Sequence, residues 1–126
     1  MSKAEGRIVH LADVTPSARA TEMAAESGKD PRQLEVVLSE TAKIVRWTHG
    51  VLISQTHHGF VCANAGVDRS NAGAPDTVIL LPTDPDASAA RLRESLGART
   101  GATVAVVVTD TFGRAWREGH VNVAIG

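Results

Sequence analysis

The sequence has a single cysteine, Cys62, among its 126 residues. One cysteine excludes an internal disulfide and any zinc site built from several cysteines, and it fits a reducing compartment. The neighbours of this cysteine, Val61 and Ala63, are typical of a small buried residue in a strand. With no obvious activating partner nearby in the sequence, we interpret Cys62 as a packing residue rather than a nucleophile.

Long apolar runs are also missing. The longest strongly apolar stretches, such as Val104 to Val108, have five residues, whereas a membrane-spanning helix needs roughly 20. The first residues, Met1 to Arg7, lack the apolar centre of a secretory signal. We therefore expect no membrane association, and the cytoplasm is the default location.

Neither sign of charge dominates, because 13 Lys and Arg residues stand against 14 Asp and Glu residues. The formal net charge of -1 gives no global field for nucleic acid, so any anion site must be local. Common hydrolase and nucleotide-binding motifs, including H-E-x-x-H, Walker A and G-x-G-x-x-G, are absent from the sequence. His57 and His58 do not suggest a shared metal, because adjacent strand residues point to opposite faces.

The composition is that of a globular domain, with 43% hydrophobic and 21% charged residues, and the order of the predicted strands and helices indicates the α/β class. The predicted elements are a mobile connection with room for a short helix over 10–31, an amphipathic helix over 32–47, strands at 51–54 and 59–63, a strand at 78–81, a helix opened by Asp84-Pro85-Asp86 and ended by Gly97 or Gly101, and a strand over 103–109. Asp30 before Pro31 supplies the cap of the first long helix, and Leu92 and Leu96 form the inner stripe of the second.

The run from Thr103 to Thr109 is rich in β-branched residues without polar alternation, which indicates a strand covered on both faces. With the preceding strand and helix it predicts a β-α-β crossover in a mixed sheet. In such units the ligand crevice lies beyond the carboxyl ends of the parallel strands. Asp110 follows the second strand directly, so this geometry predicts that Asp110 is a site residue.

A second polar cluster occupies the loop from Asn64 to Asn71, where Asp68 stands among amides, a guanidinium and a hydroxyl. Mg²⁺ takes one or two protein carboxylates and completes its shell with phosphate oxygens, so Asp68 and Asp110 suffice if their loops converge. Turn capping by Asp68 and Asn71 is an equally simple interpretation. From the sequence alone both remain open.

The segment after Asp110 carries two arginines, Arg114 and Arg117, which can bind phosphate or carboxylate through paired N–H donors. The alternative is a solvated loop with an Arg117–Glu118 surface pair and Trp116 as a packing residue.

Three ordered motifs resemble the coenzyme F420-0:gamma-glutamyl ligase family. They are His58-Gly59-Phe60-Val61-Cys62-Ala63-Asn64-Ala65-Gly66-Val67-Asp68-Arg69-Ser70-Asn71, then Leu80-Leu81-Pro82 with Asp84-Pro85-Asp86-Ala87-Ser88-Ala89, and Thr109-Asp110-Thr111-Phe112-Gly113-Arg114 with Trp116-Arg117. The stretch Ser2-Lys3-Ala4-Glu5-Gly6-Arg7 resembles the family's Ser-Lys-x-x-Gly-Arg segment near the nucleotide.

The resemblance implies a GTP-dependent ligase that uses Mn²⁺ or Mg²⁺ to add L-glutamate to coenzyme F420-0 through a gamma linkage. Asp68, Asp110 and Thr111 match family metal ligands, and Lys3 and Asn71 match residues that contact GTP. Arg114 and Arg117 are assigned as catalytic residues on charge alone. An α/β fold in an intertwined homodimer is also implied by the resemblance.

Residues 1–126 resemble part of the family's domain, without its N-terminal nucleotide loop and its C-terminal half. Two rival functions follow: a non-catalytic GTP- or metal-binding fragment, and a dimerisation fragment without ligand affinity.

Overall fold

The computed structural model describes residues 5–48, 50–69, 74–114 and 117–126. Within these ranges the elements are β1 (Ile8–His10), η1 (Leu11–Asp13), α1 (Ala18–Ser27), α2 (Pro31–Ser39), β2 (Thr41–Thr48), β3 (Val51–Thr56), β4 (Val61–Ala63), η2 (Asn64–Gly66), β5 (Thr77–Ile79), α3 (Pro85–Thr100), β6 (Thr109–Arg114) and β7 (Arg117–Ala124). The predicted mixture of helices and strands is confirmed.

The described strands form three small antiparallel sheets, ordered β1-β5, β2-β3-β4 and β6-β7. The predicted β-α-β crossover is therefore wrong for the described strands. The helix α3 does follow β5 and precede β6, but β5 pairs with β1 and β6 pairs with β7. The strands on either side of the helix thus belong to different sheets.

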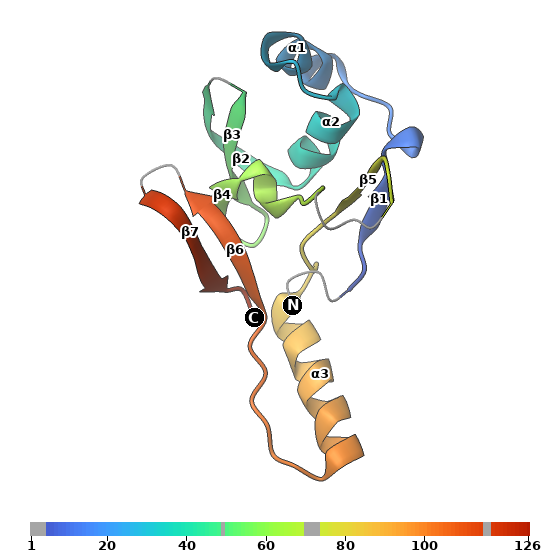
Figure 1. Ribbon diagram of the computed structural model, residues 1–126, viewed down its shortest axis with the longest axis vertical. Coiled ribbons are helices and arrows are strands. Elements are labelled where there is room, and N and C mark those ends of the chain that lie inside the picture. The colour runs from blue at the N-terminus through green and yellow to red at the C-terminus, as the bar shows by residue number, and fades with distance from the viewer. Residues whose placement is uncertain (1–4, 49, 70–73, 115–116) are drawn as a thin grey trace.

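The predicted strand over 103–109 begins later than expected, since β6 starts at Thr109. The preceding residues are extended, and Figure 1 shows that they run beside α3 in an arm that projects from the sheets. Val106 packs toward the cluster of Ala89, whereas the side chain of Val107 is 62% exposed. Within the described residues, only the face with Val106 is covered, so the prediction of a strand buried on both faces is wrong.

The segment predicted as a mobile connection contains the helix α1, bounded by two caps. The Ser17 side chain accepts a hydrogen bond from Ala20 N at 3.2 Å, and Gly28 ends the helix in the left-handed conformation. The helix buries Ala20, Met23 and Ala24 in the same cluster as Leu34 of α2 and Leu52 of β3. The helix agrees with the short one for which the prediction left room, whereas its capped ends and buried face correct the prediction of a mobile connection.

The helix α2 begins as predicted, because Asp30 caps it and Pro31 occupies its first turn. It ends at Ser39, and the residues from Thr41 form the strand β2, so the predicted extent to Trp47 is wrong. The pairing of β2 with β3 has irregularities between Thr41 and Lys43 and between Ile44 and Arg46. Such bulges break the period-2 alternation, which left the apolar positions with helix-like spacing.

The helix α3 has the predicted ends. Asp84 Oδ1 accepts a hydrogen bond from Ala87 N at 2.9 Å, and Gly101 stops the helix with φ of 70°. Its inner face is made by Pro85, Ser88 and Ala89 rather than by the predicted leucines, since Leu96 is exposed and Leu92 only half-buried. None of the helices that the structure describes is long and apolar enough to cross a membrane.

Cys62 is buried in β4, which confirms the packing interpretation. It shares a hydrophobic cluster with Leu81, Ala89, Val108, Phe112 and Ile125. This cluster joins β4 to β6, and these are the two elements that lead to Asp68 and carry Asp110.

Candidate metal and nucleotide site

The main chain of Asp68 is held in place by β5. Asp68 N donates to Ile79 O at 2.9 Å, and Ile79 N donates to Asp68 O at 2.7 Å. On the other side of β5, Ile8 of β1 is paired with the same Ile79. Because paired strands lie about 4.8 Å apart, the main chain of Asp68 lies about 10 Å from the N-terminal strand.

The chain reaches Asp68 through a left-handed turn. Asn64, Ala65 and Gly66 have φ of 51°, 51° and 71°, and Val67 N closes the turn on Asn64 O at 2.9 Å. A residue other than glycine in this region costs roughly 1–2 kcal/mol, and such strain is found most often at functional sites. The turn therefore marks the approach to Asp68 as a constrained segment.

Asp110 lies in β6 on the face that packs against the rest of the protein. Its strand neighbours at i-2 and i+2, Val108 and Phe112, are both buried, so the half-buried Asp110 shares their side of the strand. Phe112 meets Phe60, next to β4, with ring centroids 6.0 Å apart. The strand β4, which leads toward Asp68, is thus packed against β6, which carries Asp110, and Figure 1 shows the two strands side by side.

Thr111 faces the opposite side of β6. Its hydroxyl donates to Asn122 Oδ1 of β7 at 2.6 Å, across a directly opposed pair on the exposed face. An ion held by the Asp110 carboxylate is therefore beyond the reach of Thr111 Oγ1. The metal role that the resemblance implies for Thr111 stays a prediction.

The other predicted residues are only partly described. Lys3, Asn71 and Trp116 lie outside the described residues. Arg114 and Arg117 face each other as a backbone pair at the β6–β7 end, while their side chains lie outside the described part. Among the residues that the structure describes, no group of three or more His, Cys, Asp or Glu residues is placed to hold a metal.

The two histidines of the β3–β4 turn bind separate partners. His57 Nε2 lies 3.0 Å from Ser39 O, and His58 Nε2 lies 3.0 Å from Thr83 O. The His58 ring also stacks on Phe60, with centroids 6.0 Å apart. Each ring therefore anchors the turn to a different segment, which agrees with the expectation that they do not bind one ion together.

Sequence reasoning missed the residues that hold the N-terminal segment. Arg7 forms an ion pair with Glu40, and Glu5 binds the residues that begin α3. Both lie in the Ser-Lys-x-x-Gly-Arg stretch, so their position in that motif was the only available signal. Their partners are distant in sequence and could not be inferred from it.

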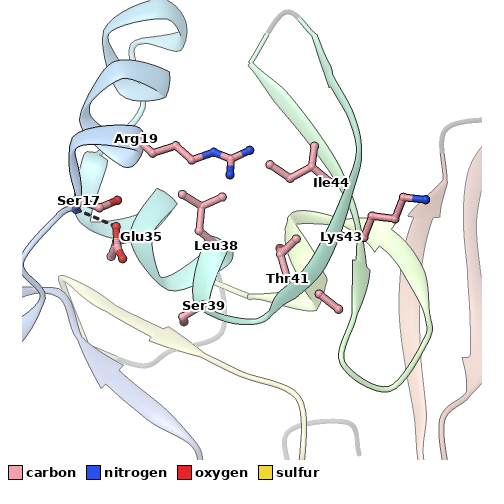
Figure 2. Close-up of a pocket in the computed structure, with 9 residues that line it drawn as sticks. Ser17, Arg19, Glu35, Leu38, Ser39, Thr41, Lys43 and Ile44 are labelled. Carbon is pink, nitrogen blue, oxygen red and sulfur yellow. Dashed lines mark hydrogen bonds between the residues drawn. The ribbon is translucent and has the colours of Figure 1, made fainter.

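The structure also has an open groove of about 520 Å³ between the helices α1 and α2 and the strand β2. Figure 2 shows Arg19 reaching across it toward Ile44, with Lys43 on the far wall. Glu35 lines the groove and accepts a hydrogen bond from Ser17 N at 2.8 Å, and the bonds from Ser17 hold the pKa of this carboxyl below its usual range. Asp68, Asp110 and Thr111 do not line the groove, so it is separate from the predicted site.

Comparison with known proteins gives one consistent result. The family described as F420-0:Gamma-glutamyl ligase matches residues 1–126. Proteins named Coenzyme F420:L-glutamate ligase from Methanopyrus kandleri, Methanothermobacter thermautotrophicus and Archaeoglobus fulgidus are 51%, 46% and 43% identical to the whole chain. The match covers 50% of each of these relatives, so the chain spans about half the length of the curated relatives it matches.

Proposed function

The chain belongs to the F420-0:gamma-glutamyl ligase family, and we propose that it acts in adding L-glutamate to coenzyme F420-0 through a gamma-glutamyl linkage, with GTP as co-substrate and Mn²⁺ or Mg²⁺ as the metal. The observation that supports this most is the match over the full chain, to relatives named as glutamate ligases. The packing of β4, which leads toward Asp68, against β6, which carries Asp110, also supports the proposal.

The metal is assigned to Asp68 and Asp110, through their carboxylates, and to Thr111, through its main-chain carbonyl. These are the hard oxygen donors that Mg²⁺ and Mn²⁺ prefer. When bound, the ion neutralises charge on the nucleotide phosphates. Two carboxylates are enough for this role, because phosphate oxygens and water complete the shell of such an ion.

The nucleotide is assigned to Lys3 and Asn71, and Arg114 and Arg117 are proposed to stabilise charge that develops during transfer. A substrate carboxylate attacks the γ-phosphorus of GTP, and the bond from that phosphorus to the leaving oxygen of GDP breaks. The product is an acyl phosphate. The amine of glutamate then attacks the acyl carbon, phosphate leaves, and the amine loses its proton. This chemistry depends mostly on positioning and electrostatic stabilisation.

A homodimer is part of the proposal, since the family resemblance implies one. Native mass spectrometry of the chain, with and without Mn²⁺, tests this separately from activity. A mass of two chains supports the dimer, and a mass of one chain contradicts it.

The second candidate is a fragment that binds GTP and metal without transferring glutamate. The observation that favours it is that the chain spans about half the length of its relatives. Calorimetry with GTP and Mn²⁺ distinguishes the two candidates when it is combined with an assay of the product.

The test is to incubate the chain with coenzyme F420-0, L-glutamate, GTP and MnCl₂ and to follow the products by mass spectrometry. The proposal predicts glutamylated coenzyme together with GDP and phosphate, and loss of all three in Asp110→Asn. Glu94→Gln, which changes an exposed carboxylate on α3, is the matched control and should keep full turnover. Binding of GTP without glutamylated product supports the second candidate instead.

A further inference from the structure

The groove between α1, α2 and β2 contains a guanidinium group without a counter-charge. Arg19 lies in the first turn of α1, and Figure 2 shows its exposed side chain reaching across the groove toward Ile44. Among the residues that the structure describes, none forms an ion pair or a hydrogen bond with this guanidinium. It is therefore available for an anion, and a guanidinium binds a carboxylate through two parallel N–H donors.

A carboxylate that is fixed in place lines the same groove. Glu35 of α2 accepts a hydrogen bond from Ser17 N at 2.8 Å. The hydroxyl and the N–H of Ser17 hold the pKa of Glu35 below its ordinary 4.5, so this group is charged at neutral pH. A carboxylate has about four acceptor positions, so Glu35 can also accept hydrogen bonds from a bound ammonium group.

Two aliphatic side chains add an apolar surface to the groove. Leu38 and Ile44 are half-buried, and both pack against the core cluster that joins α1, α2 and β3. Figure 2 shows both side chains directed toward Arg19. The groove has a volume of about 520 Å³, within the range of about 300–1,000 Å³ that is typical of small-molecule sites.

An extended peptide is the other ligand that this position suggests, because β2 lies at the edge of its sheet in the described chain. The pairing of β2 is irregular between Thr41 and Lys43 and between Ile44 and Arg46. Bulges and edge lysines interrupt the row of main-chain groups that a further strand needs. The edge of β2 is thus poorly suited to strand addition, and recognition of a small ligand by side chains is favoured.

We propose that this groove binds a free α-amino acid with an aliphatic side chain. The ligand carboxylate pairs with Arg19, its ammonium group pairs with Glu35, and its side chain lies on the two aliphatic residues. A ligand with both charges complements both groups, whereas an anion alone is repelled by Glu35 and a cation alone by Arg19. The predicted metal ligands do not line the groove, so the inference does not depend on the proposed reaction.

Titration of the whole chain with L-leucine, followed by NMR chemical shifts without nucleotide or metal, is the first test. We expect a dissociation constant of about 1 mM, as for a small ligand in an open groove. 4-Methylpentanoate lacks the ammonium group and 3-methylbutylamine lacks the carboxylate, so each should bind about tenfold more weakly. Absence of saturable L-leucine binding, or an equal affinity for either analogue, would overturn the proposal.

N-acetyl-leucinamide is the probe for strand addition, because it keeps the side chain and the main-chain groups but has neither charge. The proposal predicts that it binds at least about tenfold more weakly than L-leucine. Equal or tighter binding of this probe would favour main-chain pairing with β2 and would overturn recognition by the two charged side chains.

Two variants connect each charge of the ligand with its residue. Arg19→Gln should raise the dissociation constant of L-leucine about tenfold and leave that of 3-methylbutylamine unchanged, since this amine has no carboxylate. Glu35→Gln keeps an acceptor for Ser17 N, and it should weaken L-leucine about tenfold without weakening 4-methylpentanoate. Arg99→Gln, at an exposed position of α3, is the control and should bind L-leucine as the unaltered chain does. Equal weakening of all three ligands in both variants would overturn the assignment.

L-Glutamate separates this inference from the proposed reaction. Its side-chain carboxylate is charged, so placing it on Leu38 and Ile44 should make it bind about tenfold more weakly than L-leucine. L-Glutamate binding as tight as that of L-leucine would overturn the aliphatic selectivity. A chain that binds L-leucine but transfers no glutamate would contradict the proposed function and leave this inference in place.

Discussion

Asp68 and Ile79 exchange two main-chain hydrogen bonds, of 2.9 and 2.7 Å, that place Asp68 at the edge of β5. The bonds use only main-chain atoms, so they persist when the Asp68 carboxylate is replaced by an amide. The site can therefore be altered chemically while the chain stays in position. This separation of roles makes the candidate metal ligand testable.

The left-handed turn before Asp68 should be sensitive to a methyl group. In Gly66→Ala a Cβ would lie 2.7 Å from Leu81 Cδ1, at a φ of 71° that favours glycine. Gly28→Ala meets the same conformational cost at a φ of 69°, with no neighbour within 4 Å.

We expect Gly28→Ala to lower the free energy of unfolding by about 1 kcal/mol and Gly66→Ala by about 2–4 kcal/mol, since overpacking adds to the backbone cost. Urea denaturation of both variants measures the difference. Equal losses would show that Leu81 yields freely to the new methyl group.

The stability of the fold should decrease at acidic pH. The hydroxyl of Ser88 and the N–H of Thr83, with Arg91, hold the pKa of Glu5 below its ordinary 4.5, against the opposing effect of burial. Asp30, bound by Arg32, has its pKa lowered in the same direction.

A carboxyl whose pKa is lowered on folding stabilises the protein above the pKa of the unfolded chain, and this contribution is lost as the pH falls through the folded pKa. The urea midpoint should thus be nearly flat above about pH 6 and fall below about pH 4.5. Glu5→Gln should make this fall shallower, whereas Glu22→Gln should retain it. An identical fall in both variants would rule out a contribution from Glu5.

The contact between Phe60 and Phe112 should couple stability to metal binding. Phe112→Leu removes the tilted ring pair at 6.0 Å, and we expect a loss of about 1 kcal/mol in the free energy of unfolding. Because Asp110 shares the face of Phe112, affinity for Mn²⁺ should fall as well. Leu96→Ala, at an exposed position of α3, is the control. Unchanged Mn²⁺ affinity in Phe112→Leu would show that Asp110 is positioned by other contacts.

Local signals predicted the starts of α2 and α3 and the end of α3. Asp30 with Pro31, Asp84 with Pro85, and Gly101 act within a few residues of themselves, so the sequence contains all that their caps require. The cap formed by Ser17 was equally local. The helix that Ser17 caps was not assigned, because the Ala- and Ser-rich stretch after Ser17 carries a weak apolar pattern.

Pairing between distant segments was beyond such signals. Thr41 to Trp47 has helix-like apolar spacing, yet two bulges and the partner strand β3 make it a strand. The run from Thr103 predicted a doubly covered strand, yet the described chain covers only one of its faces.

In the candidate site too, local signals and pairing between distant segments gave different information. Asp110 was predicted as the end of a parallel strand, whereas it lies within an antiparallel hairpin on a buried face. Asp68 lies at the edge of β5 because it pairs with Ile79, which is 11 residues further along the chain. The motifs indicated which residues to consider, and only long-range pairing showed which strand holds each of them.

The central claim is that Asp68 and Asp110 hold one divalent cation, and calorimetric titration with Mn²⁺ in the presence of GTP tests it most directly. The unaltered chain should bind Mn²⁺, and Asp68→Asn and Asp110→Asn should each weaken binding by at least about tenfold. The double variant should be little worse than either single variant, because both act on one ion. Asp76→Asn, at an exposed turn position with φ of 57°, should bind as the unaltered chain does. Full Mn²⁺ affinity in either single variant, or fully additive losses in the double variant, would contradict a shared site.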